Sequence, residues 1–85
     1  AIELSPRLVY AWYNKGTVLY EAADYPSAAE CFTRAIEINP EFPEAYFNRA
    51  LVYLAQGDRD RAFADLSRAG ELGVLQAYPL MKSMK

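Results

Sequence analysis

Apolar side chains recur at intervals of three and four along most of this chain, with charged and polar residues between them. This spacing is typical of amphipathic helices, because such positions share one side of a helix. It predicts a helix over about 9–22, in which Trp12, Gly16 and Leu19 lie on one side. A second helix is predicted over about 26–39, so that the two form an antiparallel pair joined by a tight turn.

The same arrangement returns in the second half of the chain. Pro43 opens a predicted third helix, and a fourth is predicted over about 60–72, ending near Gly73. A short fifth helix is predicted in the tail, 74–85, where Pro79 is tolerated because it lies near the helix start. We expect this tail to cover the exposed side of the fourth helix.

A six-residue phrase sets the spacing of these units. Ala-Ile-Glu-Leu-Ser-Pro at 1–6 returns as Ala-Ile-Glu-Ile-Asn-Pro at 35–40, which is 34 residues further on, and weakens at 69–72. A fixed period of this size indicates helical blocks that bury their apolar sides by stacking on their neighbours. The predicted fold is therefore all-α. The predicted division is 1–8 as the end of a preceding repeat, 9–42 as repeat 1, 43–73 as repeat 2, and 74–85 as a capping helix.

The two turns inside the helix pairs carry different residues. Gly57 has the freedom for a left-handed backbone, whereas Ala23 stands at the equivalent place and is expected to be strained if both turns share one geometry. Asp24 is a candidate cap for the helix that follows it.

The repeated positions read Trp12-x-x-Lys15-Gly16-x-x-Leu19, then Ala28-x-x-x-Phe32, then Pro40, and in the second copy Tyr46-x-x-Arg49-Ala50-x-x-Tyr53, then Ala62-x-x-x-Leu66. This pattern resembles the tetratricopeptide repeat signature of W-x-x-L-G-x-x-Y, A-x-x-x-F and P. This resemblance implies a right-handed α-solenoid of helix-turn-helix repeats with a C-terminal capping helix. It also implies a protein-binding module whose concave groove is lined by the first helix of every pair.

Some positions depart from that signature. Lys15 and Arg49 replace leucine, and we expect their alkyl stems to cover apolar surface while their charges reach water. Gly70, where the first unit has Ile36, is expected to let the capping helix approach closely.

The stripe of side chains expected to face the groove is apolar and aromatic. The candidate partner-groove residues are Tyr13, Asn14, Thr17, Tyr20, Phe47, Asn48, Leu51 and Leu54. One alternative is that these side chains pack sideways within the array, with both asparagines bonded inside it. As a set they favour a groove for a peptide or an amphipathic helix, because large apolar patches on soluble proteins usually have partners.

Some members of the resembled family bind chaperone tails through a clamp of lysine, asparagine and arginine residues. Asn48 matches one clamp asparagine, but Tyr13 and Thr17 stand where a lysine and a second asparagine are needed. We therefore do not expect clamp-type binding.

Composition narrows the function further. The net charge of −2 comes from interspersed charges without a basic stripe, so no nucleic-acid partner is expected, and no apolar run approaches the roughly 18 residues of a membrane span. Histidine is absent and Cys31 is the only cysteine, so we predict no catalytic site, no metal site and no cofactor. We expect a soluble, non-enzymatic protein, with the cytoplasm as its expected location.

Cys31 occupies the place that Asp65 has in the second unit, a position that tolerates charge. We therefore expect a thiol near the surface, without a redox role.

Two functions remain open. The first is a scaffold that binds a peptide or helix of a partner protein in the groove. The alternative is self-association through the uncapped N-terminal face, which would bury Trp12 in a homo-oligomer.

Overall fold

The structure, a computed structural model, describes residues 6–83, which form five α-helices. The helices are α1 (Pro6–Glu21), α2 (Tyr25–Ile38), α3 (Pro43–Ala55), α4 (Arg59–Glu71) and α5 (Ala77–Ser83). The predicted all-α class is confirmed. The first predicted helix was three residues short at its start, because Pro6 is compatible with the first turn of a helix, where N–H groups have no helical partner. The predicted end of a preceding helix at 1–5 lies outside the described residues.

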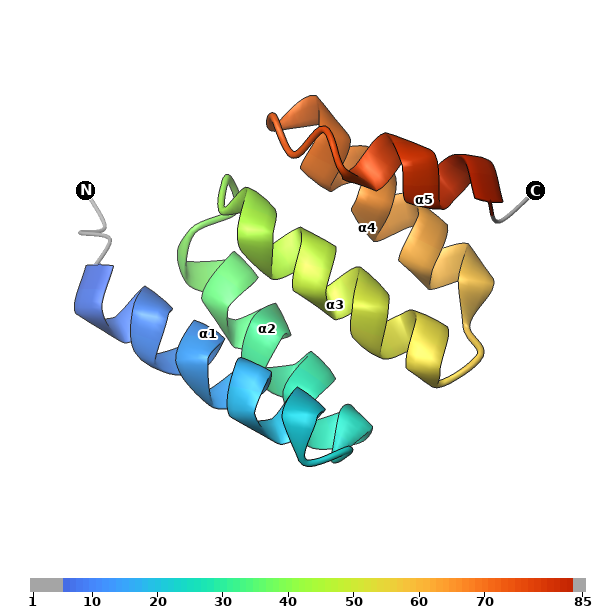
Figure 1. Cartoon of the computed structure of the whole chain (residues 1–85). Helices are drawn as coiled ribbons and strands as arrows, with labels where there is room; N and C mark the ends of the chain where they lie inside the picture. Colours follow the sequence, from blue (N-terminus) through green and yellow to red (C-terminus); the bar gives the residue numbers. More distant parts are fainter. Residues whose placement is uncertain (1–5, 84–85) are drawn as a thin grey trace.

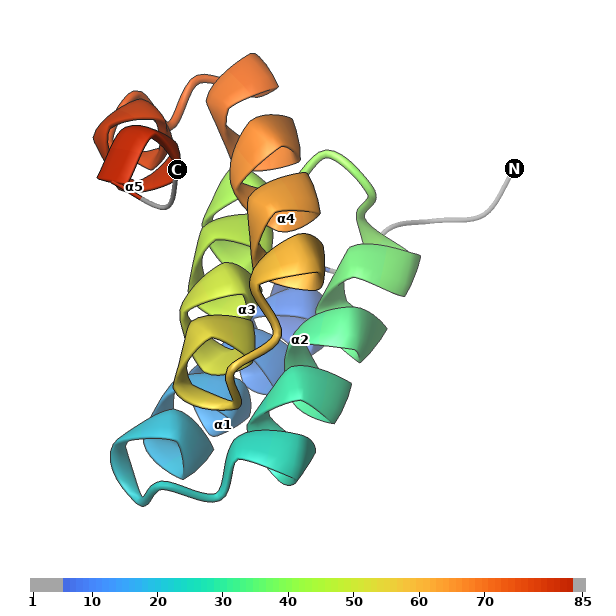
Figure 2. The same ribbon diagram turned by 90° about the vertical axis from the view of Figure 1, so that its right-hand side faces the viewer.

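The helices follow one another across the molecule, from α1 at one end to α5 at the other (Figure 1). α1 packs against α2 and α3 against α4, while α2 joins the two pairs through its contact with α3. α5 packs on α4, and the view turned by 90° shows it on the second pair, away from α2 (Figure 2). These are stacked helix-turn-helix units, as predicted. Within residues 6–83, no helix has the length and apolar character needed to cross a membrane.

The predicted packing stripes form the core. Phe32 and Leu66, which are 34 residues apart, are both fully buried. Gly16 faces Phe32 so closely that an added Cβ would lie 2.8 Å from the ring, whereas Ala50 packs in one cluster with Leu66. The two repeats therefore fill equivalent positions with different pairs of residues. The first repeat places glycine beside phenylalanine, and the second places alanine near leucine.

Both inner turns adopt the left-handed backbone. Ala23 has a φ of 63° and Gly57 a φ of 81°, so the strain predicted for the alanine is present. The capping prediction for Asp24 was wrong, because its side chain accepts no hydrogen bond from α2. Pro26, the second residue of that helix, lacks one of the two N–H groups that a cap can bind. Asp58 has no such neighbour, and its side chain accepts from the Arg61 N–H.

The capping helix approaches α4 as predicted. An added Cβ on Gly70 would lie 2.8 Å from the ring of Tyr78, so the ring would have to move if this residue carried a side chain. Pro79 is the third residue of α5, where its missing N–H does no harm.

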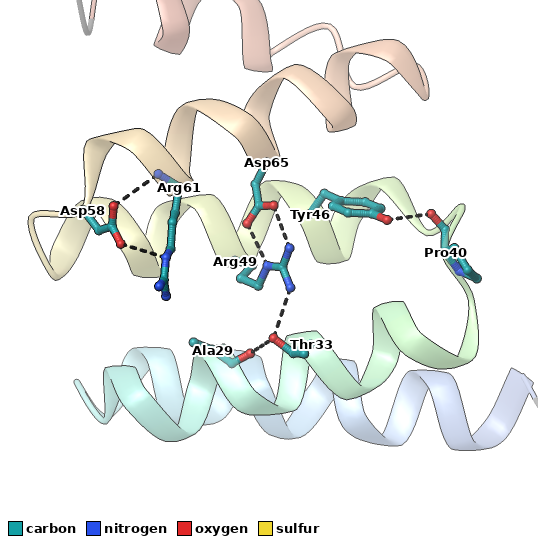
Figure 3. A network of polar contacts seen from close by, with 8 residues as sticks. All are labelled: Ala29, Thr33, Pro40, Tyr46, Arg49, Asp58, Arg61 and Asp65. Carbon is teal, nitrogen blue, oxygen red and sulfur yellow. Dashed lines mark hydrogen bonds and ion pairs between the residues drawn. The ribbon is translucent and has the colours of Figure 1, made fainter.

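A buried ion pair lies within the second helix pair, between α3 and α4, and its arginine also bonds to α2 of the first pair (Figure 3). Arg49 donates from Nε and Nη2 to the two carboxylate oxygens of Asp65, both at 2.7 Å, and from Nη1 to Thr33 Oγ1 at 3.1 Å. Burial acts to lower the pKa of Arg49, but the hydrogen bond and charge of Asp65 outweigh it and raise that pKa. The expectation that this charge reaches water was wrong, because Asp65 neutralises it inside the molecule. Lys15 does remain exposed, with Nζ 5.7 Å from the centre of the Trp12 ring.

The prediction of a surface position for Cys31 was also wrong. The whole residue is only 4% exposed, and its counterpart Asp65 is 6% exposed. The repeat position accepts an aspartate because Arg49 pairs with it, so a charged residue there does not indicate exposure. Burial raises the pKa of the Cys31 thiol, and the charge of Lys15 only partly offsets this.

Candidate functional site

A hollow of about 490 Å³ lies where the start of α3 meets α1 and the α4–α5 connection. It is lined by Tyr13, Pro43, Glu44, Phe47, Asn48, Leu72, Gly73, Val74 and Gln76. Three of these, Tyr13, Phe47 and Asn48, belong to the predicted groove set. Tyr13 and Phe47 occupy the same position of successive repeats, 34 residues apart on the first helix of each pair.

The Tyr13 ring is held in place from two sides. Its centre lies 5.8 Å from that of Phe32 and 5.0 Å from that of Phe42. Its hydroxyl oxygen accepts a hydrogen bond of 2.8 Å from Asn48 Nδ2. This bond joins α1 to α3, so Tyr13 supports the stacking of the helices and also lines the hollow.

Asn48 takes the role that the alternative interpretation assigned to it, a hydrogen bond within the array. That bond uses only the amide nitrogen. The amide is therefore oriented with Nδ2 toward Tyr13, and Oδ1 is the group that it can offer to the backbone N–H of a bound segment.

The first turn of α3 forms another wall. Pro43 is its first residue, and Glu44 carries an exposed carboxylate in the first turn, where the helix dipole favours a negative charge. Phe47 follows one turn later and is half-buried against the cluster that contains Ala50 and Leu66. Its ring thus has both a packed side and an open side.

The remaining predicted groove residues do not line this hollow. Asn14 is exposed, Thr17 donates from Oγ1 to the Tyr13 carbonyl at 3.0 Å, and Tyr20 packs on Tyr25 with ring centres 5.8 Å apart. The sideways packing of Tyr20 matches the alternative that the sequence left open. Leu51 and Leu54 are half-buried, and Leu54 belongs to the cluster shared with α4 and α5.

Sequence reasoning missed the wall formed by the α4–α5 connection. Leu72, Gly73, Val74 and Gln76 come from the segment where the repeat phrase breaks down. The loss of the repeat phrase was the only sign of this wall in the sequence, since it marks where the chain departs from the pattern of a full repeat.

A second surface corresponds to the alternative function. A hollow of about 280 Å³ is lined by residues of α1 and α2, namely Trp12, Lys15, Leu19, Ser27, Glu30 and Cys31. Beside these α1 residues in the sequence, Val18 is 64% exposed, whereas Val52, at the same position of the next repeat, is fully buried. The equivalent face of α3 is covered by α2, so the face of α1 is an uncovered copy of an interface that the molecule already contains.

Residues 6–83 hold no cluster of three or more histidine, cysteine, aspartate or glutamate side chains that could bind a metal ion.

Comparison with known proteins identifies relatives of these repeats. The family described as TPR repeat matches residues 16–57, and the family described as Tetratricopeptide repeat matches residues 44–72. A STIP1 homolog of Dictyostelium discoideum is 37% identical over 59 residues, which are 69% of this chain and 10% of that protein. Tetratricopeptide repeat protein 36 of Caenorhabditis elegans is 40% identical over 56 residues, which are 66% of this chain and 31% of that protein. The chain thus spans between about a tenth and a third of these relatives.

A solved structure has the same fold. The first TPR of Spaghetti (RPAP3), bound to the HSP90 peptide SRMEEVD, superposes with a TM-score of 0.89 at 22% sequence identity. The match covers 98% of this chain and 68% of that one. At this identity the likeness concerns the fold.

Proposed function

This chain belongs to the tetratricopeptide repeat family, and on that premise we propose that it is an interaction scaffold which binds a peptide or helix of a partner protein. The observation that carries the proposal is the hollow in which Tyr13 and Phe47 present aromatic surface from successive repeats. Aromatic side chains with one packed and one open side are frequent anchors of protein interfaces.

The proposed contact surface extends beyond the hollow. Thr17 and Tyr20 continue it along α1, and Leu51 and Leu54 continue it along α3. The solved structure with this fold holds a peptide of HSP90, which supports peptide binding as a use of the fold.

A pair of phenylalanine variants tests this proposal. Phe47→Ala removes a ring that lines the hollow, whereas Phe63→Ala removes an exposed ring of α4 that does not line it. Ligands come from a random twelve-residue peptide library displayed on phage, and the binding of selected peptides is then measured by fluorescence polarisation. Losing an interface anchor should weaken binding about tenfold or more for Phe47→Ala, and Phe63→Ala should change it little. Loss of binding with Phe63→Ala alone would refute the assignment.

Tyr13 needs a milder substitution than alanine. Because its ring packs against Phe32 and Phe42, truncation would damage the core as well as the hollow. Tyr13→Phe keeps the ring and removes the hydroxyl that accepts from Asn48. Circular dichroism of every variant separates a binding defect from a folding defect.

Self-association through the face around Val18 is the second candidate. The full burial of Val52 at the equivalent position favours it. Light scattering over a concentration series should then show the mass rising above the 9.6 kDa of one chain, and Val18→Ser should prevent the rise. A constant monomer mass would rule this candidate out.

A further inference from the structure

We propose that the hollow selects partner segments in which a basic side chain neighbours an apolar one, an inference that rests on the function proposed above. The apolar side chain would occupy the space between Tyr13, Phe47 and Val74. The basic side chain would pair with the Glu44 carboxylate on the α3 wall.

The charge on the walls of the hollow is the first argument. Among the described residues that line it, Glu44 is the only charged side chain. The ion pairs within residues 6–83 are Arg34 with Glu37, Arg49 with Asp65, and Arg61 with Asp58. Among residues 6–83, therefore, no lysine or arginine forms an ion pair with the exposed Glu44 carboxylate.

The charged residues nearest in sequence to the wall at Leu72 lie outside the hollow. Exposed Glu71 directly precedes Leu72 and Arg68 lies one turn earlier in α4, but neither side chain lines the hollow. Among the described residues, Glu44 therefore supplies the only charge on its walls. An acidic segment would meet a like charge here, whereas a lysine or arginine would meet an unpaired carboxylate.

The apolar part of the hollow limits what can accompany the basic residue. The rings of Tyr13 and Phe47 and the side chains of Leu72 and Val74 line it, with Asn48 at the α3 wall. Since Asn48 uses Nδ2 toward Tyr13, its Oδ1 can accept a backbone N–H of the bound segment. Such a contact would fix the orientation of the segment and hence the spacing between its apolar and basic residues.

Charge variants of Glu44 provide the test. Glu44→Gln keeps the shape and removes the charge, Glu44→Lys reverses it, and Arg68→Gln is the control for a charge outside the hollow. Each protein is used to select from the random twelve-residue phage library, and selected peptides are measured on all variants. We expect the wild type to enrich a basic residue at a fixed spacing from an apolar one. Glu44→Gln should weaken these peptides about three- to fivefold, as for an exposed ion pair, and Arg68→Gln should leave them unchanged.

The outcomes separate this inference from the proposed function. Enrichment of acidic residues by Glu44→Lys would support the inference further. Peptides that lose binding with Phe47→Ala but show no charge preference, or no response to Glu44→Gln, would overturn the inference and leave the scaffold function standing. Enrichment of peptides that Phe47→Ala does not affect, or no enrichment at all, would overturn both.

Discussion

Exchanging one packing pair between the two repeats gives the sharpest test of the packing. The first repeat places Gly16 against the fully buried ring of Phe32, and the second places Ala50 in one cluster with Leu66. Gly16→Ala together with Phe32→Leu would give the first repeat the pair of the second. Each single change breaks a fit that the double change should partly restore.

The magnitudes follow from the contacts. The Cβ added by Gly16→Ala would lie 2.8 to 3.0 Å from three Phe32 ring atoms. Such overpacking lowers the free energy of unfolding by about 1–3 kcal/mol, and the higher helix propensity of alanine offsets roughly 1 kcal/mol of this loss. Phe32→Leu leaves a partial cavity, so we expect a loss of about 1–3 kcal/mol, less than the roughly 3–5 kcal/mol lost in a Phe→Ala change.

In the double variant the smaller side chain vacates the space that the new methyl group needs. We therefore expect the double variant to be at least about 1 kcal/mol more stable than the sum of the single effects predicts. The double variant should still be less stable than the wild type, because it loses the contact between the rings of Tyr13 and Phe32. Such a contact contributes about 0.5–1.5 kcal/mol.

Urea unfolding followed by far-UV circular dichroism measures all four proteins. Additivity of the two single effects within about 0.5 kcal/mol would refute the reasoning, since it would mean that the methyl group and the ring do not compete for space.

Other changes test other parts of the structure. Asp65→Ala leaves the Arg49 guanidinium buried without its partner and should lower the free energy of unfolding in urea by about 3 kcal/mol or more. A double variant with leucine at both positions should lose much less of this free energy. Ala23→Gly relieves the left-handed backbone and should stabilise by about 1 kcal/mol, seen as a raised melting temperature; a lowered one would contradict the strain. Because burial raises the pKa of Cys31, the folded state holds the thiol proton more tightly than the unfolded state. Stability should therefore fall as pH rises past the ordinary thiol pKa of 9.0, and Cys31→Ala should remove that part of the fall.

Much of the fold could be predicted because stacked repeats place equivalent core residues at a fixed spacing in the sequence. The spacing of Phe32 and Leu66 predicted two equivalent core positions, and both are fully buried. Glycine at position 70 predicted the close approach of α5, since the Tyr78 ring lies where a Cβ at this position would be.

The rest depended on contacts that no local pattern reveals. Asp65 looked like a surface residue, and its burial depends on Arg49 from the other helix of its pair. The hollow was only half predicted. Tyr13 and Phe47 follow from the repeat, whereas the wall at Val74 depends on how the irregular α4–α5 connection lies beside the start of α3.

The central claim, that the hollow is where a partner binds, is tested most directly by nuclear magnetic resonance. The isotope-labelled domain would be titrated with a peptide selected from the phage library, and the backbone amide shifts followed residue by residue. The claim predicts that the largest changes fall at Phe47, Asn48 and Val74. Changes concentrated around Trp12 and Val18, with these residues undisturbed, would contradict it.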